Sequence, residues 1–210
     1  MRPVRGAGRE VVLFVDTFNR WFVRWQVKLL LAFGRRTAAL ERVGLSGLTM
    51  AAIAREAGIA TGTLYVYHRS KEELLNALYE QVKGALVGLI DVDIDAATPF
   101  RMRFQMNWTR LLRHRLAHGP EAVFMDQYYN SPWFSEASRQ FSARFAAGCL
   151  RFFDEARAQQ IVKDAPTMML AAHFFGSVRD TASLLRSGDL PDTEAALAQA
   201  FGLCWDGIKA

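Results

Sequence analysis

Cysteine is scarce in this chain of 210 residues, which contains only Cys149 and Cys204. Two thiols are too few for a disulfide framework or a thiolate metal site, so we expect a reduced, cytoplasmic protein. No uninterrupted apolar run approaches the roughly 18 to 20 residues that a membrane-spanning helix needs. The apolar run at residues 11–15 is also too short for the core of a signal peptide, and we expect no export signal.

The side-chain groupings that catalysis requires are also missing. The chain has four histidines, and no nucleophile with its base, carboxylate pair or glycine-rich phosphate loop stands out. His114 and His118 lie one helical turn apart, but Glu121 comes after a Gly-Pro break and is no convincing third ligand. The aspartates within residues 91–95 lack the glycine and the later glutamate of a calcium loop, and indicate a solvated linker. We therefore predict no enzyme, no metal and no cofactor.

Two short helical patterns follow one another within residues 49–71, separated by Gly58. The first has apolar residues at positions i, i+3, i+4 and i+7, namely Met50, Ile53, Ala54 and Ala57. Gly58 can adopt the left-handed conformation that ends a helix. A second short helix is predicted over residues 61–67, with Leu64 as its buried anchor. Ser70 and Glu73 form a capping box at which a third helix starts.

The second short helix exposes residues rich in hydroxyl groups, namely Thr61, Gly62, Thr63, Tyr65 and Tyr67. Hydroxyl donors at a helix N-terminus suit phosphate and base-edge contacts in DNA. Lys71 stands in the first turn of the third helix, where a cation opposes the helix dipole. A phosphate facing Lys71 would account for a cation at this unfavourable position. The pattern therefore indicates a helix-turn-helix unit that binds double-stranded DNA.

Residues 32–79 resemble the DNA-binding domain of the TetR family of transcriptional regulators. The resemblance rests on residues 44–50, the pairs Ile53-Ala54 and Ala57-Gly58, and residues 62–65 and 70–75. It implies phosphate contacts for Thr49, Thr63, Tyr65 and Lys71, and positions nearest the base edges for Thr61, Gly62 and Tyr67. The family usually has a capping residue where this chain has Ala60, so we expect Thr61 to shift into the capping role.

The resemblance also implies a repressor that binds a palindromic operator and is released by an unknown small-molecule effector. The charge distribution agrees with DNA binding in the N-terminal part. Of the net charge of +5, the residues through Lys83 carry 13 Lys and Arg against 7 Asp and Glu, and the rest carry 13 against 14. The positive field therefore lies where phosphates would be neutralised.

We divide the chain into residues 1–26, a DNA-binding domain at 27–83, and a ligand-binding and dimerisation domain at 84–210. Residues 1–26 form a basic arm and an extra amphipathic helix, in which Arg20 and Arg24 lie on a different face from Phe18, Phe22 and Trp25. Three interpretations stay open for this helix. It could clamp the DNA backbone, lie on a membrane surface as part of a membrane-associated interaction protein, or pack on the core.

Beyond Pro99 every pattern is helical, with Gly and Pro breaks between the segments. Five helices are predicted, at residues 98–117, 120–129, 133–159, 166–186 and 192–208. With those before them the total is about nine. The fold class is therefore all-α, with an N-terminal helix-turn-helix domain of three helices and a C-terminal helical bundle.

Aromatic side chains recur on the helices of the bundle. Such stripes form either plain core or a concave site for a flat or apolar effector, and both interpretations stay open. The candidate effector contacts are Trp108, Phe124, Tyr128, Phe145, Phe152 and His173. His173 is alternatively a hydrogen-bonded core histidine.

Two apolar stripes on the last two helices predict a homodimer. They are Ala171, Phe175, Val178, Ala182 and Leu185 on one helix, and Leu197, Ala200, Cys204 and Ile208 on the other. Two such helices from each of two subunits can close a four-helix interface around a two-fold axis.

Overall fold

The computed structural model describes residues 44–87, 89–90, 93–95 and 97–210, and within these ranges the chain is all-helical, as predicted. After the 3-10 turn η1 (Leu45–Gly47) come α3 (Met50–Ala57), α4 (Thr61–Tyr67), α5 (Lys71–Val87), α6 (Phe100–Ala117), α7 (Gly119–Tyr129), α8 (Glu136–Ala158), α9 (Thr167–Ser187) and α10 (Glu194–Ile208). The five predicted C-terminal helices correspond to α6–α10 to within a few residues at each end. The predictions for the basic arm and the amphipathic helix fall outside the described residues.

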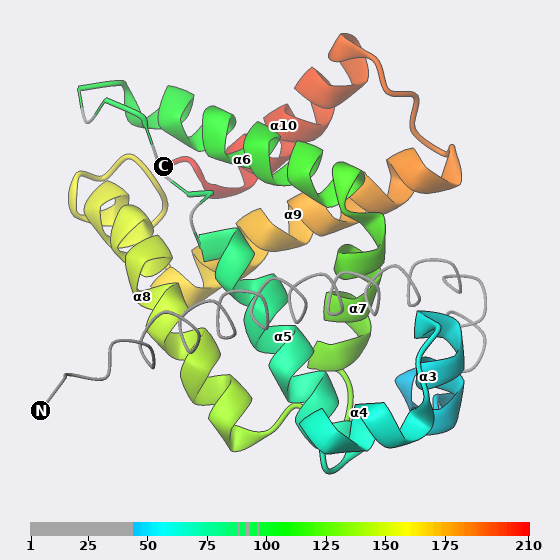
Figure 1. Cartoon of the computed structure of the whole chain (residues 1–210). Helices are drawn as coiled ribbons and strands as arrows, with labels where there is room; N and C mark the ends of the chain where they lie inside the picture. The colour runs from blue at the N-terminus through cyan, green and yellow to red at the C-terminus, as the bar shows by residue number, and fades with distance from the viewer. Residues whose placement is uncertain (1–43, 88, 91–92, 96) are drawn as a thin grey trace, which may run out of the picture.

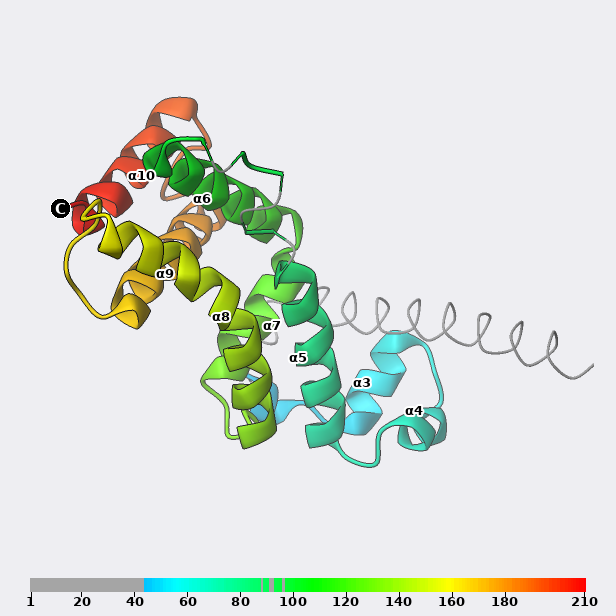
Figure 2. The same ribbon diagram turned by 90° about the vertical axis from the view of Figure 1, so that its left-hand side faces the viewer.

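The helices form two groups joined by α5, α7 and α8 (Figures 1 and 2). The short helices α3 and α4 lie at one end of the molecule, and α6, α9 and α10 lie at the other. Between them α5 and α8 run side by side, and α7 packs against α5. A displacement at one end can therefore reach the other end through α5, α7 and α8.

Side-chain caps and left-handed glycines set several helix ends. Thr49, Ser135 and Thr193 each accept a hydrogen bond from the backbone N–H three residues later, at the starts of α3, α8 and α10. Gly58 ends α3 at φ 71° and Gly188 ends α9 at φ 83°, where a side chain would be strained. These local signals explain why the boundaries could be predicted from the sequence.

The first hydrophobic core joins the N-terminal helices to the C-terminal part. It contains the apolar faces of α3, α4 and α5 together with three residues of α7, namely Phe124, Met125 and Tyr128. Phe124 and Tyr128 are fully buried, and Tyr128 stacks on Tyr79 of α5 with ring centroids 4.8 Å apart. Because α7 contributes to this core, α3–α5 do not pack as a body separate from the rest.

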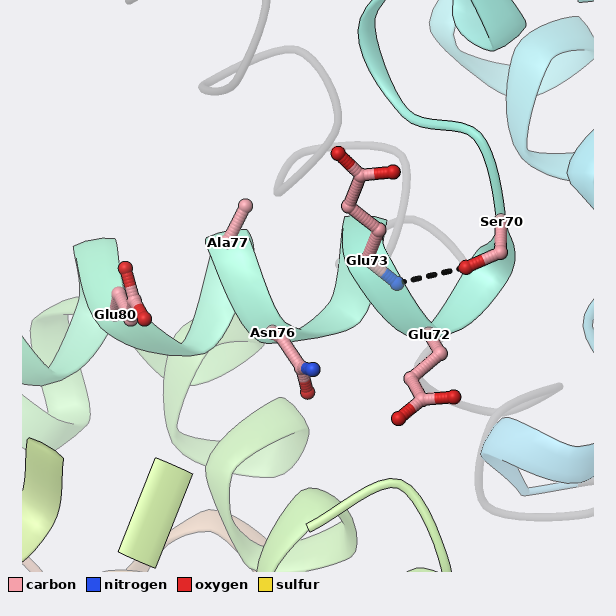
Figure 3. A pocket seen from close by; sticks show the side chains of 6 residues that line it. All are labelled: Ser70, Glu72, Glu73, Asn76, Ala77 and Glu80. Atoms are coloured by element: carbon pink, nitrogen blue, oxygen red, sulfur yellow. Dashed lines mark hydrogen bonds between the residues drawn. The ribbon is translucent and has the colours of Figure 1, made fainter. Parts of the chain in front are cut away.

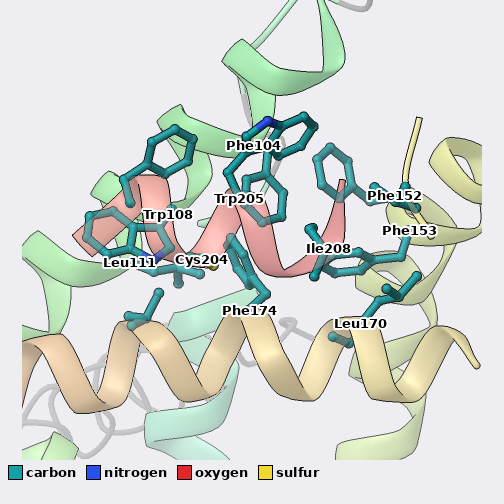
Figure 4. Close-up of a cluster of buried hydrophobic side chains, with 14 of the residues drawn as sticks. Phe104, Trp108, Leu111, Phe152, Phe153, Leu170, Phe174, Cys204, Trp205 and Ile208 are labelled. Carbon is teal, nitrogen blue, oxygen red and sulfur yellow. The ribbon is translucent and has the colours of Figure 1, made fainter. Parts of the chain in front are cut away.

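A second core lies between α6, α8, α9 and α10 (Figure 4). Its centre is a group of aromatic rings in edge contact, with Phe104 and Phe174 4.8 Å apart. The indole nitrogen of Trp108 donates to Ser177 Oγ at 2.9 Å, which gives this buried donor a partner. Ser177 Oγ is also 2.9 Å from Cys204 Sγ, so one hydroxyl joins α6, α9 and α10.

The apolar stripes predicted to face a second subunit are mostly buried within the chain, and that assignment was wrong. Ala171, Val178, Ala182, Cys204 and Ile208 belong to the second core, where α9 and α10 cover each other and α6. Leu185, Leu197 and Ala200 are partly buried against it, and Phe175, 41% exposed, is the one stripe residue that faces outward. The other exposed large apolar side chains of these two helices are Met168, Met169, Leu184 and Leu203.

None of the helices in the described part of the chain combines the length and the hydrophobicity that a membrane span requires. The same residues contain no group of three or more side chains able to hold a metal ion. His114 and His118 instead stack on each other, with ring centroids 4.1 Å apart.

Candidate nucleic-acid interface

Helices α3 and α4 form the predicted helix-turn-helix. Met50, Ile53, Ala54 and Ala57 are buried as expected. Thr49 Oγ1 accepts the backbone N–H of Ala52 at 3.1 Å, so this hydroxyl acts as a helix cap. Leu64 is fully buried and anchors α4 to the first core. The left-handed Gly58 turns the chain so that one side of α4 stays exposed.

The predicted contact residues of α4 lie on its accessible side. Gly62 is exposed, Tyr65 is 50% exposed, and Thr61, Thr63 and Tyr67 are partly exposed. The expectation that Thr61 caps this helix is wrong, because Ala60 occupies the N-cap position and makes no side-chain hydrogen bond there. An extended Ala60 (φ −68°, ψ 141°) leaves Thr61 as the first helical residue. Its hydroxyl is therefore not committed to a cap.

Three further residues of this surface were not identified from the sequence. Val66, on α4, is 79% exposed, although valine normally favours burial. Arg55 on α3 and Arg69 after α4 carry exposed cations near the same helix. The sequence could have identified Val66 as a surface residue. The helix that carries it is short and buries only Leu64, so a second apolar residue on this helix had to be exposed.

The start of α5 is capped as predicted, with one difference. Ser70 Oγ accepts the backbone N–H of Glu73 at 3.1 Å (Figure 3). The carboxylate of Glu73 accepts the backbone N–H of Arg69 at 2.7 Å, one residue before the position expected of a capping box.

The adjoining hollow on α5 is lined by Ser70, Glu72, Glu73, Asn76, Ala77 and Glu80 (Figure 3). Its carboxylates would repel phosphate, so DNA is expected on the α4 side.

Lys71 has partners within the protein. Its Nζ donates to the carbonyl oxygens of Leu45 and Ser46, at 2.5 and 3.2 Å. It also lies 4.2 Å from the centroid of the Trp133 ring. Partial burial lowers the pKa of Lys71. These contacts account for a cation in the first turn of α5 without a phosphate, so the dipole argument does not by itself place Lys71 on DNA.

The six candidate effector contacts do not gather at one site. Trp108 and Phe152 lie in the second core, whereas Phe124 and Tyr128 lie in the first. Phe145 is on α8 beside Phe141, with ring centroids 4.5 Å apart. The structure therefore does not show a single pocket lined by all of them, because the aromatic residues of α6 lie in the second core and those of α7 in the first, while α8 contributes to both.

The surroundings of Tyr128 and His173 differ from those predicted for them. The Tyr128 hydroxyl contacts Asn76 Oδ1, lies 2.8 Å from Ser138 Oγ and lies 3.1 Å from the Trp133 carbonyl oxygen. Burial raises the pKa of Tyr128, so the hydroxyl stays protonated within this network. His173 is exposed rather than in the core, and its Nε2 lies 3.1 Å from the carbonyl oxygen of Cys204.

Comparison with known proteins supports the helix-turn-helix assignment. Residues 37–78 match the family described as bacterial regulatory proteins, tetR family. A helix-turn-helix-type transcriptional regulator of Haemophilus influenzae is 29% identical over 105 residues, which is 50% of this chain and 56% of that protein. The chain thus spans little more than half the length of this relative.

Solved structures share the fold over most of the chain. A TetR family transcription regulator from Marinobacter aquaeolei VT8 superposes with a TM-score of 0.79 at 21% identity, covering 91% of this chain and 98% of that one. The transcriptional regulator FadR of Bacillus subtilis, in complex with stearoyl-CoA, has a TM-score of 0.62 at 17% identity, covering 86% and 98%. A helix-turn-helix at one end and a helical bundle at the other are the arrangement that these solved regulators share with the chain. The chain thus has a helix-turn-helix region of the tetR family type and the fold of TetR family transcription regulators.

Proposed function

We propose that the protein binds a palindromic DNA operator through α4 and represses transcription until a small-molecule effector releases it. The observation that carries the proposal is the accessible side of α4, which presents hydroxyl groups and the apolar Val66. In this arrangement Gly62, Thr61 and Tyr67 lie nearest the base edges, and Val66 packs on thymine methyl groups. Thr49, Thr63 and Tyr65 contact phosphates, with Arg55 and Arg69 adding cations.

A homodimer is part of the proposal. The exposed apolar side chains Met168, Phe175 and Leu203 on α9 and α10 would form its contact. They replace the buried stripe residues as the candidate interface. Two copies related by a two-fold axis would place their α4 helices in successive major grooves, about 34 to 36 Å apart.

The effector is proposed to enter the second core. Trp108 and Phe152 are the predicted contacts that belong to this core, which also contains Phe104 and Phe174. The FadR neighbour shows that a protein of this fold can be complexed with stearoyl-CoA. A thermal-shift screen of lipophilic compounds on wild type and Trp108→Leu tests the location. Hits that stabilise both proteins equally would place the effector elsewhere.

DNA binding itself is tested by anisotropy titration of a labelled duplex that the wild type selects from a randomised pool. Tyr65→Ala should weaken binding at least several-fold, because it removes a phosphate contact while its half-exposed ring contributes little to the core. Met102→Ala is the matched control, since Met102 is 53% exposed but lies on α6 at the other end of the molecule. Equal affinities of Tyr65→Ala and Met102→Ala would contradict the proposed interface.

A further inference from the structure

The ammonium group of Lys71 is held by two parts of the chain that are distant in sequence. The carbonyl oxygens of Leu45 and Ser46 belong to η1, immediately before the helix-turn-helix. The indole ring of Trp133 belongs to the segment between α7 and α8. An ammonium has three N–H donors and attracts the face of an aromatic ring. Two carbonyls and one indole face therefore satisfy most of its bonding capacity.

Trp133 is in turn fixed by the C-terminal helices. Its backbone carbonyl oxygen lies 3.1 Å from the Tyr128 hydroxyl at the end of α7. The same hydroxyl lies 2.8 Å from Ser138 Oγ in the first turn of α8. A shift of α7 or α8 therefore moves the indole ring relative to Lys71.

We propose that Trp133 is a positioning residue that retains the Lys71 ammonium on the protein and away from DNA phosphate. The inference rests on the DNA-binding function proposed above. A phosphate that binds Lys71 competes with Leu45, Ser46 and Trp133 for the same N–H groups. The ring stabilises the DNA-free arrangement by about two- to fivefold in the equilibrium constant, as expected of a cation over an accessible aromatic face.

The contact also gives the C-terminal part a direct influence on DNA affinity. An effector changes this affinity only by binding the retained and released arrangements unequally. Displacing the segment that carries Trp133 alters the retention of Lys71 at the start of α5. In this proposal, the contact between Lys71 and Trp133 is the two-state element that joins the segment between α7 and α8 to the start of α5.

A mutant cycle on the full-length protein tests the proposal. Binding to a labelled duplex selected on the wild type is measured at several salt concentrations for Trp133→Leu, Trp133→Phe, Lys71→Met and the Trp133→Leu, Lys71→Met double variant. Trp133→Leu is expected to tighten binding about two- to fivefold per subunit, and Trp133→Phe to stay near wild type because a ring remains. Lys71→Met should weaken binding and reduce the salt dependence. In that background, Trp133→Leu should have no further effect.

Two results would overturn the proposal and assign Trp133 a purely structural role. One is weaker DNA binding by Trp133→Leu than by wild type. The other is an equal change in affinity on adding Trp133→Leu to wild type and to Lys71→Met. A wild type with no affinity for any duplex would instead overturn the proposed DNA-binding function. If Trp133→Leu does not fold, fluorine NMR of 5-fluorotryptophan-labelled wild type provides the test. The Trp133 resonance, assigned with Trp133→Phe, should move on saturation with duplex. An unmoved resonance would show that Lys71 is not released.

Discussion

The imidazole ring of His173 on α9 lies directly against Gly207 on α10. A Cβ atom at Gly207 would come within 2.6 Å of His173 Nε2, closer than non-bonded atoms approach. The ring is held there because Nε2 lies 3.1 Å from the carbonyl oxygen of Cys204. A glycine at this position therefore allows α9 and α10 to cross closely.

Gly207→Ala should displace this ring and break its hydrogen bond, at a cost of about 0.5 to 1.5 kcal/mol. Gly202→Ala, on the same helix, places its methyl group in open space. Its only expected effect is therefore a stabilisation of up to about 1 kcal/mol from the higher helix propensity of alanine. In urea unfolding, Gly207→Ala should be less stable than Gly202→Ala by about 1 kcal/mol. The difference should vanish when both carry His173→Ala. Equal stabilities with His173 present would show that the ring moves without cost.

Ala60→Ser should stabilise the protein, because α4 begins without a side-chain cap. A serine hydroxyl at an extended N-cap accepts a backbone N–H of the first turn, which contributes about 1 kcal/mol. The matched comparison is Thr49→Ala, which removes the bond to the Ala52 N–H and should cost about as much. Both are measured by urea unfolding. A neutral Ala60→Ser beside a destabilising Thr49→Ala would mean that the N-terminus of α4 is satisfied in another way.

Charge introduced on the outer side of α9 or α10 should separate the proposed dimer. Phe175→Glu and Leu203→Glu each place a carboxylate on a side chain that is 41% and 77% exposed in the single chain. Sedimentation velocity at micromolar concentration should give a dimer for wild type and a monomer for both variants. Met106→Glu changes a comparably exposed residue of α6, 44% exposed, and should remain a dimer. A dimer in all four proteins would move the interface elsewhere.

Stability should fall as the pH is lowered from about 7.5 to 5. Burial lowers the pKa of His68, an effect that Glu73 partly offsets, and burial also lowers the pKa of His114. A pKa below its unfolded value means that the unfolded state binds more protons, so stability is present above the unfolded pKa of about 6.5 and is lost below it. His68→Asn should flatten the plot of unfolding free energy against pH. An unchanged slope would show that His68 accepts a proton without cost.

Local signals predicted much of this fold. Met50, Ile53, Ala54 and Ala57 define one helix face, and Gly58 ends the helix, because both effects depend only on neighbouring residues. The bounds of α6–α10 could be predicted in the same way, from the glycine and proline residues between the helical segments. The buried anchor Leu64 could also be predicted from spacing alone.

Tertiary partners could not be predicted in this way. Periodicity identifies an apolar face but not the surface that covers it, so the stripe through Val178 and Cys204 was assigned to a second subunit instead of the second core. For the same reason, Trp108 and Tyr128 were placed in one pocket although different cores contain them. The internal partners of Lys71 include Trp133, 62 residues away in the sequence, and no local pattern points to that contact.

In vitro selection from a pool of randomised duplexes tests the central claim, sequence-specific DNA binding through α4, most directly. Wild-type protein should enrich an inverted repeat whose half-sites are centred about one helical turn, or a multiple of it, apart. Gly62→Ala adds one methyl group in open space on α4, so the fold should persist while the preferred half-site changes or affinity falls. Failure of the wild type to enrich any repeat, or enrichment of the same repeat with the same affinity by Gly62→Ala, would contradict the account.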